Sequence, residues 1–390
     1  MRRSLGLPAL ILSVAAATAL AACSTETAGT ATGSSGHKSG STASIPAGLD
    51  TGSYPTTPRA IPAFSSDQAW VAEGNRMGDA LIQVNEIDSR MTLGGAGLRS
   101  FPVLSGIQLS SRVPDDTSLV FEANGMKVGM TTTRGDSMDS PTVATRIGLY
   151  RFPTDAAAQK AVTQIRAKVS GKEQVSISSA PGAVATEFKP GTVDSYLAQG
   201  PIVVNVSGTG PTTSDAAGFV TKAYQLEIPR LKSFTPTPVA EVTKLPSDRD
   251  GIMSRILGLK QSSSTSVGTE LATGYLSQTG LFHRIKDISK KGIYVTAGVD
   301  LVGQSDGVVY RTRDAGAAKQ FLTDLYAIGD KKPADAAPGV PGMKCVRDYD
   351  ATLLRCGVAV GRYVADLTAS SIGDARQKAS AEYALLTEAG

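Results

Sequence analysis

The stretch Val308-Val309-Tyr310-Arg311-Thr312-Arg313-Asp314-Ala315 passes from a β-rich run into the start of a helix within eight residues. The same order occurs 160 positions earlier, where Tyr150-Arg151 ends a β-rich run and Asp155-Ala156 opens a helix. Val and Tyr favour strands, and a change of apolar spacing after them indicates a helix. The stretch therefore marks a structural module that the chain uses twice.

Further features recur at this spacing to within one position. The shared features are the apolar spacing of the helix, a Pro-Gly turn before a strand, a later strand and the start of a last helix. They are Ala158, Ala161, Val162, Ile165 and Val169 against Ala318, Phe321, Leu322 and Leu325; Pro181-Gly182 against Pro341-Gly342; Val203-Val204 against Tyr363-Val364; and Ser214-Asp215-Ala216 against Gly373-Asp374-Ala375. We interpret them as two related modules.

In each module the sequence predicts the order strand, helix, strand, strand, helix. Consecutive strands with no helix between them favour antiparallel pairing, so the predicted class is α+β rather than a doubly wound parallel sheet. We expect two related modules of antiparallel sheet, each with helices packed on one face. They are assigned to residues 45–235 and 240–390, and a Pro-rich linker around Phe234-Thr235-Pro236-Thr237-Pro238 joins them.

Local patterns add elements around this repeat. Residues 67–83 are predicted as a helix capped by Asp67, which is weakened by glycines at positions 74 and 78. Residues 118–122 and 126–133 are predicted as strands, and the Asn124-Gly125 pair between them indicates a hairpin. Residues 294–302 are predicted as a strand that precedes Gly303.

The N-terminus has the pattern of an export signal. Arg2 and Arg3 precede an apolar run, which ends in Leu20-Ala21-Ala22-Cys23. Small residues before a cysteine resemble a bacterial lipobox, so residues 1–22 are predicted to be a lipoprotein signal peptide. Cys23 is the predicted lipidation site, which places the protein on the extracytoplasmic face of the cell membrane. The alternative is an ordinary secretory signal with an incidental cysteine.

Residues 23–44 are predicted to be a flexible tether. After Cys23 they consist of Ser, Thr, Ala and Gly apart from Glu26, His37 and Lys38, and this composition cannot form a core. Its root-mean-square reach is about 25 Å by the scaling of flexible linkers. The folded part is thus expected to be held near the membrane but free to turn.

The charge balance narrows the possible partners. The formal net charge is +4, which becomes +2 once Arg2 and Arg3 are removed, so no nucleic-acid partner is expected. No other apolar run approaches the roughly 20 residues that span a bilayer. The expected partners are the membrane, through the lipid anchor, and an unknown small molecule, lipid or envelope protein.

The remaining cysteines, Cys345 and Cys356, are predicted to form a disulfide, because an exported chain tends to oxidise such a pair. Closing a loop of this size contributes roughly 3 kcal/mol. The alternative, free or metal-binding thiols, lacks further ligands nearby. The sequence predicts no metal site and no cofactor.

Two motifs that resemble catalytic sites lack their partners. Asp50-Thr51-Gly52 matches an aspartic-protease triplet, but no second triplet supplies the other carboxylate. Ser305 lies in Gly303-Gln304-Ser305-Asp306-Gly307, which matches a nucleophile elbow, yet a strand rather than a helix is predicted to follow it. The two histidines, His37 and His283, both precede Ser305. No catalytic residue is assigned, and a hairpin turn is the preferred interpretation of Ser305.

Two segments carry a resemblance to a known family. They are Leu49-Asp50-Thr51-Gly52-Ser53-Tyr54-Pro55-Thr56-Thr57-Pro58-Arg59, soon after the tether, and residues 298–302 with 308–315. Together with the lipobox they resemble uncharacterised lipoproteins of mycobacteria, nocardiae and related actinobacteria. The resemblance implies a lipid-anchored envelope protein and implies no particular activity.

The sequence therefore favours a non-catalytic, lipid-anchored protein of the cell envelope that serves in binding, sensing or assembly outside the membrane. A cleft between two related modules is a common place for a ligand. The alternative function is an exported hydrolase that acts on the envelope, which requires a nucleophile or a carboxylate pair to converge with a base.

Overall fold

The structure is a computed structural model that describes residues 45–94, 100–109, 112–259, 272–348 and 354–390. Residues Thr42–Gly390 belong to one compact unit. The predicted signal peptide, Cys23 and the tether lie outside the described residues. Among the described residues, no helix combines the length and the apolar character needed to cross a membrane.

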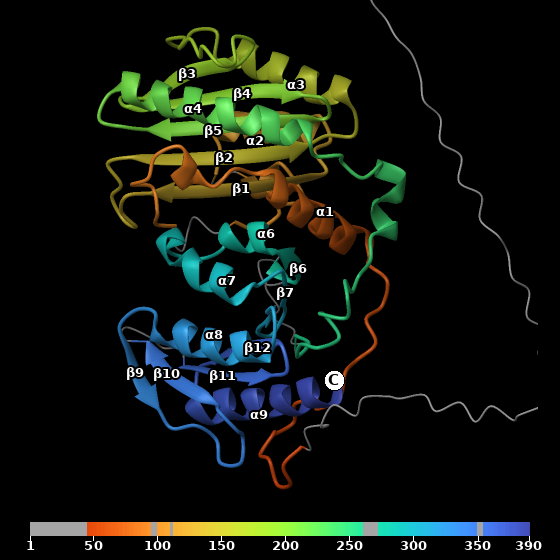
Figure 1. The fold of residues 1–390 in the computed structure, drawn as a ribbon. Helices are drawn as coiled ribbons and strands as arrows, with labels where there is room; N and C mark the ends of the chain where they lie inside the picture. The colour runs from red at the N-terminus through yellow and green to blue at the C-terminus, as the bar shows by residue number, and fades with distance from the viewer. Residues whose placement is uncertain (1–44, 95–99, 110–111, 260–271, 349–353) are drawn as a thin grey trace, which may run out of the picture. The chain divides into compact units, whose positions relative to one another are not determined.

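In the described chain, the first module is built on a five-stranded antiparallel sheet with the order β1-β2-β5-β4-β3 (Figure 1). Its strands are β1 (Val128–Gly135), β2 (Ala144–Arg151), β3 (Val184–Lys189), β4 (Thr192–Gln199) and β5 (Ile202–Thr209). Its helices are α1 (Ser66–Ala80), η1 (Val84–Glu86), η3 (Ile107–Leu109), α2 (Asp115–Ala123), α3 (Asp155–Lys168) and α4 (Thr213–Lys232). The short helix η4 (Val239–Lys244) follows the module.

The second module has a seven-stranded antiparallel sheet with the order β6-β7-β8-β12-β11-β10-β9 within the same described ranges. Its strands are β6 (Gly274–Ser277), β7 (Leu301–Gln304), β8 (Val308–Arg311), β9 (Lys331–Ala334), β10 (Lys344–Asp348), β11 (Leu354–Val360) and β12 (Tyr363–Ala369). Its helices are α6 (Gln278–Phe282), η5 (Ile288–Lys291), α7 (Gly292–Ala297), α8 (Ala315–Ala327) and α9 (Ile372–Glu388).

The two sheets share one topology, which confirms the α+β class with two related modules. The order β1-β2-β5-β4-β3 corresponds to β7-β8-β12-β11-β10, and β6 and β9 extend the second sheet at its two edges. Tyr150 lies opposite Val203, whereas Tyr310 lies opposite Val364. The spacing between equivalent residues is therefore 160 on β2 and β8 but 161 on β5 and β12. The sequence comparison of the two modules had matched the later strands at a spacing of 160.

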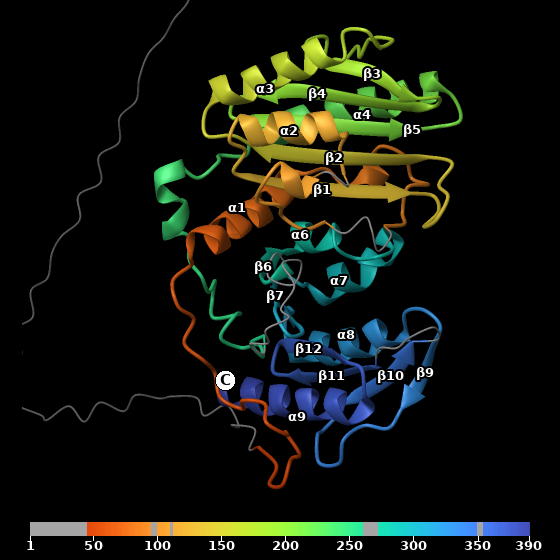
Figure 2. The ribbon, with the colours of Figure 1, turned by 180° about the vertical axis from the view of Figure 1, so that it is seen from behind.

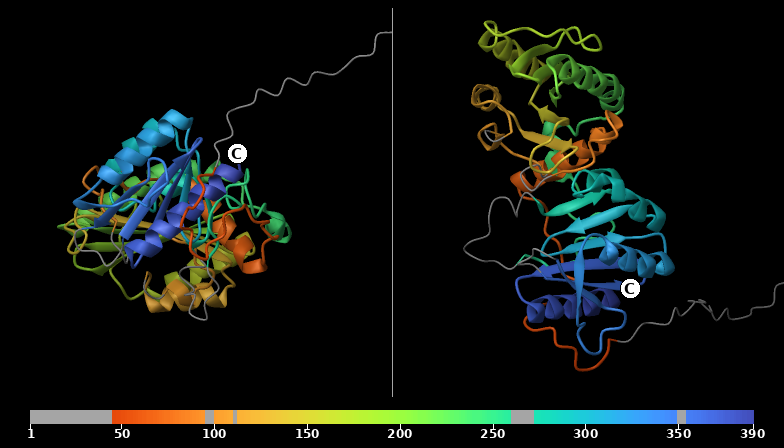
Figure 3. Two further views of the ribbon diagram at one scale, coloured as in Figure 1. Left: turned by 90° about the horizontal axis from the view of Figure 1, so that it is seen from below. Right: turned by 90° about the vertical axis from the view of Figure 1, so that its left-hand side faces the viewer.

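The helices cover both faces of each sheet, which corrects the expectation of helices on one face. In the first module α4 lies on one face and α2 and α3 lie on the other (Figures 1 and 2). In the second module α9 and α8 lie on opposite sides of the sheet (Figure 3). The reason is that neighbouring strand residues such as Val203 and Val204 are both apolar, so both faces need cover.

Two segments predicted as strands contain helices instead. Residues 118–122 lie in α2, and residues 292–297 form α7 before the chain enters β7. Gly125 follows α2 at φ +72°, and the Met126 N–H donates to the Phe121 carbonyl at 3.1 Å. This geometry ends a helix in a Schellman motif, so Asn124-Gly125 marks a helix terminus rather than a hairpin.

The predicted first helix is observed, with shifted ends, as α1. Ser65 rather than Asp67 caps it: the Ser65 hydroxyl accepts a bond from the Gln68 N–H at 3.3 Å. Gly74 lies against β1, and a Cβ atom there would fall 2.8 Å from a Val128 methyl group. The two glycines lower the helix propensity of this segment, but they permit the close packing of α1 on the sheet.

The leader segment, residues 45–63, packs on the second module although its position in the chain assigned it to the first. Tyr54 is buried in the core beneath α9, and its hydroxyl donates to Asp374 Oδ1 at 2.6 Å. Gln377 Nε2 donates to both carboxylate oxygens of Asp50, at 3.0 and 3.1 Å. The Asp50-Thr51-Gly52 triplet thus attaches the leader to α9.

The Pro-rich linker is fixed in place by α1. Glu73 is fully buried, and its two carboxylate oxygens accept bonds from the Thr237 N–H at 2.9 Å and the Thr237 hydroxyl at 2.8 Å. Arg76 and Arg151 both form ion pairs with this carboxylate. A buried charge needs such partners, so Glu73 ties the linker to both α1 and β2.

Candidate functional site

A cavity of about 780 Å³ opens on the face of the second sheet that carries α7 and α8. Its apolar lining consists of Leu93, Leu281, Ile285, Tyr294, Val308, Tyr310, Leu325 and Ile328. Its polar lining consists of Arg284, Lys286, Asp287, Lys290, Gln304, Asp330, Lys331 and Arg355, with Gly329 beside them. A volume of this size is typical of a small-molecule site.

The apolar part of the cavity rests on an aromatic cluster. Tyr294 on α7 and Tyr310 on β8 have ring centroids 6.0 Å apart, and both contact Phe321 on α8, at 5.1 and 5.2 Å. Burial raises the pKa of Tyr294 to about 12, so its phenol stays neutral at ordinary pH. These tilted and edge-on contacts make a rigid apolar surface.

Arg284 is the most constrained cation of the lining. Its Nε donates to the Ser100 carbonyl at 3.1 Å, and its guanidinium lies 4.9 Å from the Phe101 ring centroid. Its other donors bond to the Ala272 carbonyl at 3.2 Å, to Gln304 Oε1 at 2.8 Å and to Asn75 Oδ1 at 2.8 Å. All four acceptors are neutral, and burial lowers the pKa of Arg284 to about 9.

Lys286 and Lys290 follow Arg284 along the same wall and are exposed. Neither forms an ion pair with a described carboxylate. Asp287 stands between them, but its Oδ1 accepts a bond from the Ser289 N–H at 2.9 Å and so caps η5. The wall therefore presents two ammonium groups whose charge no neighbouring carboxylate neutralises in the described structure.

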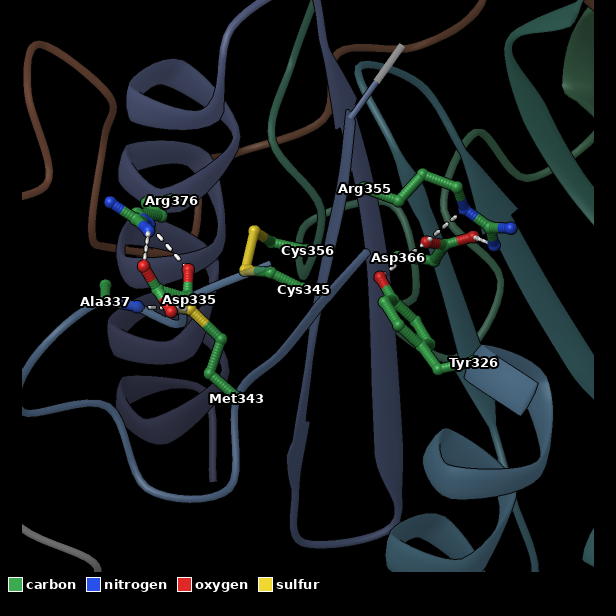
Figure 4. The surroundings of a disulfide bond; sticks show 9 residues. All are labelled: Tyr326, Asp335, Ala337, Met343, Cys345, Arg355, Cys356, Asp366 and Arg376. Carbon is green, nitrogen blue, oxygen red and sulfur yellow. Dashed lines mark hydrogen bonds and ion pairs between the residues drawn. A yellow bond between two sulfur atoms is a disulfide. The ribbon is translucent and has the colours of Figure 1, made fainter. Parts of the chain in front are cut away.

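Arg355 is held differently, because Asp366 neutralises it (Figure 4). Its Nε lies 3.2 Å from Asp366 Oδ1, and the Tyr326 hydroxyl donates to the same oxygen at 2.9 Å. Burial alone would lower the pKa of Arg355, but the Asp366 carboxylate outweighs it and raises that pKa. Arg355 is thus part of a closed ion-pair network at the floor of the cavity.

The opposite end of the cavity is formed by the C-terminus of α8. The Lys331 ammonium lies 3.3 Å from the Leu325 carbonyl oxygen and 5.7 Å from the Tyr326 ring centroid. The carbonyls at a helix C-terminus carry partial negative charge, which a cation stabilises. Lys331 therefore stabilises the C-terminus of α8.

The equivalent place in the first module is nearly filled. A cavity of about 50 Å³ is lined there by Ile165 and Val169, which correspond to Leu325 and Gly329 at the 160-residue spacing. The pairing of β4 with β5 and of β11 with β12 makes Asp194 the counterpart of Arg355. The duplicated site thus differs in both volume and charge.

A buried aromatic side chain comes from a different element in each module. Tyr196 on β4 is buried beside Phe121, with ring centroids 6.3 Å apart, and its counterpart on β11 is Gly357. A Cβ atom on Gly357 would lie 2.7 Å from the Tyr326 hydroxyl oxygen. In the second module Tyr326 from α8 therefore occupies the space over Gly357, where the first module has its tyrosine on the strand.

The disulfide lies on the other face of the second sheet. Cys345 on β10 and Cys356 on β11 are directly opposite each other, with Cα atoms 4.1 Å apart and an S–S bond of 1.98 Å. Both are buried in the core under α9, whereas Tyr326, Arg355 and Asp366 lie on the opposite side of the strands (Figure 4). The predicted disulfide is thus present, and it braces the sheet behind the cavity.

The other residues considered from the sequence do not gather at one site. Ser305 lies in the turn of the β7–β8 hairpin, where its N–H donates to the Gly307 carbonyl at 2.9 Å, as the hairpin interpretation predicted. His283 is buried, and its Nε2 lies 3.0 Å from the Gly78 carbonyl oxygen. Burial lowers its pKa to about 3, so the ring is neutral. His37 and Cys23 lie outside the described residues.

The cationic wall was not predicted from the sequence. No role was assigned to Arg284, Lys286 or Lys290 from the sequence. The available signal was the alternation of apolar and basic residues over positions 282–291. Within the described ranges, no three His, Cys, Asp or Glu side chains are grouped so as to hold a metal ion.

The fold and the cavity define a two-module α+β protein with one amphiphilic cavity described in its second module. The chain belongs to the family described as Domain of unknown function (DUF7373): the N-terminal domain of that family matches residues 62–247, and its C-terminal domain matches residues 252–389. No curated protein matches the chain. Among solved structures, the extracellular domain of PknH from Mycobacterium tuberculosis matches with 14% identity and a TM-score of 0.29, over 40% of this chain and 94% of that one.

Proposed function

We propose that this protein is a lipid-anchored binding protein of the cell envelope that takes a small-molecule ligand into the cavity of its second module. The observation that carries the proposal is the cavity of about 780 Å³, lined by a rigid aromatic surface and a cationic wall. Such concave sites, with a few polar groups among apolar ones, are the usual place for a ligand.

The chemistry of the lining favours binding over catalysis. The described residues that line the cavity include no serine, cysteine or histidine that could serve as a nucleophile or its base. Ser305 and His283, the residues an esterase mechanism would use, are held by a hairpin turn and by burial. The proposal is therefore a binding role rather than an exported hydrolase.

The proposed location rests on the chain's N-terminal pattern and its disulfide. Leu20-Ala21-Ala22-Cys23 supports lipidation of Cys23, and the polar segment after it supports a tether to the outer face of the membrane. A buried disulfide supports an oxidising compartment. The actinobacterial lipoproteins that the leader motif resembles carry this motif soon after a lipobox and its tether.

The proposal is tested by filling the cavity. The chain from residue 24 onward is exported from a bacterial host behind a cleavable secretory signal that leaves no cysteine, purified without detergent and examined by native mass spectrometry for a bound small molecule. Ile328→Trp places a large ring in the cavity wall and should abolish the bound mass. Val295→Trp adds the same ring to the exposed side of α7, outside the lining, and should retain it.

Loss of the ligand in Ile328→Trp alone supports the proposal. A ligand that both variants retain equally, or its absence from the wild-type protein together with failure to bind any added amphiphile, would overturn it. Far-ultraviolet circular dichroism confirms that both variants are folded.

A further inference from the structure

The cavity lining carries an excess of positive charge. It holds five cationic and two acidic side chains. Of the cations, Arg355 is neutralised by Asp366, and Lys331 serves the C-terminus of α8. Arg284, Lys286 and Lys290 remain without a carboxylate partner among the described residues, and all three lie on the wall between α6 and α7.

Arg284 has a donor left over for a ligand. A guanidinium has five N–H donors. Four of them bond to neutral oxygens of the protein, and the second hydrogen of Nη2 has no acceptor among the described residues. A part-buried cation with neutral partners and a spare donor is stabilised by an anion that supplies both charge and an acceptor.

The apolar part of the lining indicates where an apolar part of the ligand would lie. Tyr294 and Tyr310 line the cavity beyond the cationic wall, together with Leu325 and Ile328 at the end of α8. At the α8 end the charge of Lys331 is offset by the helix carbonyls, and Asp330 lines the cavity beside it, so a negative group is favoured at the Arg284 wall and an apolar group at the α8 end.

We infer that the ligand is an amphiphilic anion, whose carboxylate or phosphate head contacts Arg284, Lys286 and Lys290 and whose apolar body lies over Tyr294 and Tyr310. This inference rests on the proposed function and adds the chemical class and orientation of the ligand. The carboxylate and the phosphate share the recognition chemistry, and the experiment separates them.

Isothermal titration of the delipidated chain with four probes tests the inference. Dodecanoate and dodecyl phosphate should each bind with one equivalent, and the better of them identifies the head group. Dodecanol, which has the same chain and no charge, should bind at least tenfold more weakly. Inorganic phosphate alone should bind more weakly than dodecyl phosphate, because it lacks the apolar body.

Charge reversal on the wall supplies the matched variants. Lys286→Glu and Lys290→Glu change exposed side chains, so folding is expected to persist, and each should weaken dodecanoate or dodecyl phosphate at least tenfold. Both should leave dodecanol unchanged. Lys319→Glu, on the exposed side of α8 and outside the lining, should leave all four affinities unchanged.

The outcomes separate the inference from the proposed function. If dodecanol binds as tightly as the anions and the lysine variants bind normally, the anionic head is wrong while ligand binding in the cavity stands. If inorganic phosphate binds as tightly as dodecyl phosphate, the apolar half is wrong. If no probe binds and Ile328→Trp changes nothing, the proposed function itself fails.

Discussion

Two glutamates, one in the last helix of each module, are buried in similar environments. Glu227 on α4 accepts a bond from the Ile82 N–H at 2.9 Å, and Glu382 on α9 accepts one from the Leu257 N–H at 3.0 Å. The other oxygen of each carboxyl has no hydrogen-bond partner in the described structure. Burial raises the pKa of both carboxyls to about 8, so both are neutral in the folded protein at pH 7.

These two carboxyls predict that stability falls as pH rises towards 8. The folded protein keeps two protons that the unfolded chain, with an ordinary carboxyl pKa of 4.5, has released. Their contribution is complete below about pH 4.5 and is lost through pH 8, at about 1.4 kcal/mol per pH unit and per group. The urea midpoint of the wild type should therefore be lower at pH 8.5 than at pH 6.5. The double variant Glu227→Gln, Glu382→Gln should show a smaller difference.

The comparison between pH 6.5 and pH 8.5 lies above the pH range in which His283 changes the stability in the opposite direction. Its pKa of about 3 in the folded protein lies below its ordinary value of 6.5, so it costs stability as pH falls below 6.5. Glu173→Gln, which changes an exposed carboxyl, is the control and should keep the full wild-type difference. A double variant that keeps that difference as well would show that neither buried carboxyl is protonated in the folded state.

At the scale of elements, the repeat was predictable and the short helices α2 and α7 were not. Apolar spacing, Pro-Gly turns and helix starts recur in the sequence, and α3, α4, α8 and α9 follow them. The short helices α2 and α7 carry runs such as Ile293-Tyr294-Val295 that favour strands locally. Packing of Phe121 and Tyr294 on the sheet outweighs that preference, and a local pattern does not contain this tertiary contact.

The glycines that end these two helices form a matched pair for substitution. Gly125 and Gly298 both have positive φ, +72° and +63°, so alanine costs about 1 kcal/mol at either position. A Cβ atom on Gly125 meets nothing within 4 Å, whereas on Gly298 it would lie 2.9 Å from Arg313 Cβ. Gly298→Ala should therefore lower the free energy of unfolding more than Gly125→Ala, as measured by urea denaturation. Equal losses would mean that Arg313 moves aside without cost.

At the scale of the whole molecule, duplication produced two unequal copies of one site. The cavity is about 50 Å³ in the first copy, beside Tyr196, and about 780 Å³ in the second, where Tyr326 from α8 packs over the counterpart Gly357. Asp194 in the first is matched by Arg355 in the second, which reverses the sign of the charge at the floor. One module is thus a closed structural unit, and the other carries the cavity on the same backbone.

The cavity could not be predicted from the sequence, because its lining comes from positions as far apart as 93 and 355. Strand register and the position of α7 bring these residues together, whereas the sequence predicted a strand over residues 294–302. The role of Arg284 could not be predicted for a related reason. Its acceptors include Asn75 and Ser100, which belong to the first module. The cysteine pair was predictable because its evidence was local.

The last prediction concerns how the whole molecule is held. If Cys23 carries a diacylglycerol, the protein should partition into the detergent phase of Triton X-114, because burying acyl chains is favourable by about 0.8 kcal/mol per methylene group. Cys23→Ala removes the thiol that the lipid needs, so the variant should move to the aqueous phase or keep its signal peptide. Intact mass measurement distinguishes these two forms.

The matched control removes the other thiols instead. Cys345→Ser with Cys356→Ser deletes the disulfide and leaves Cys23, so it should stay in the detergent phase despite losing roughly 3 kcal/mol of stability. Wild-type protein that is cleaved before Cys23 yet lies in the aqueous phase at its unmodified mass would instead support an ordinary secretory signal. The cavity would then bind its ligand in a released protein, and the tether would have no membrane to hold it to.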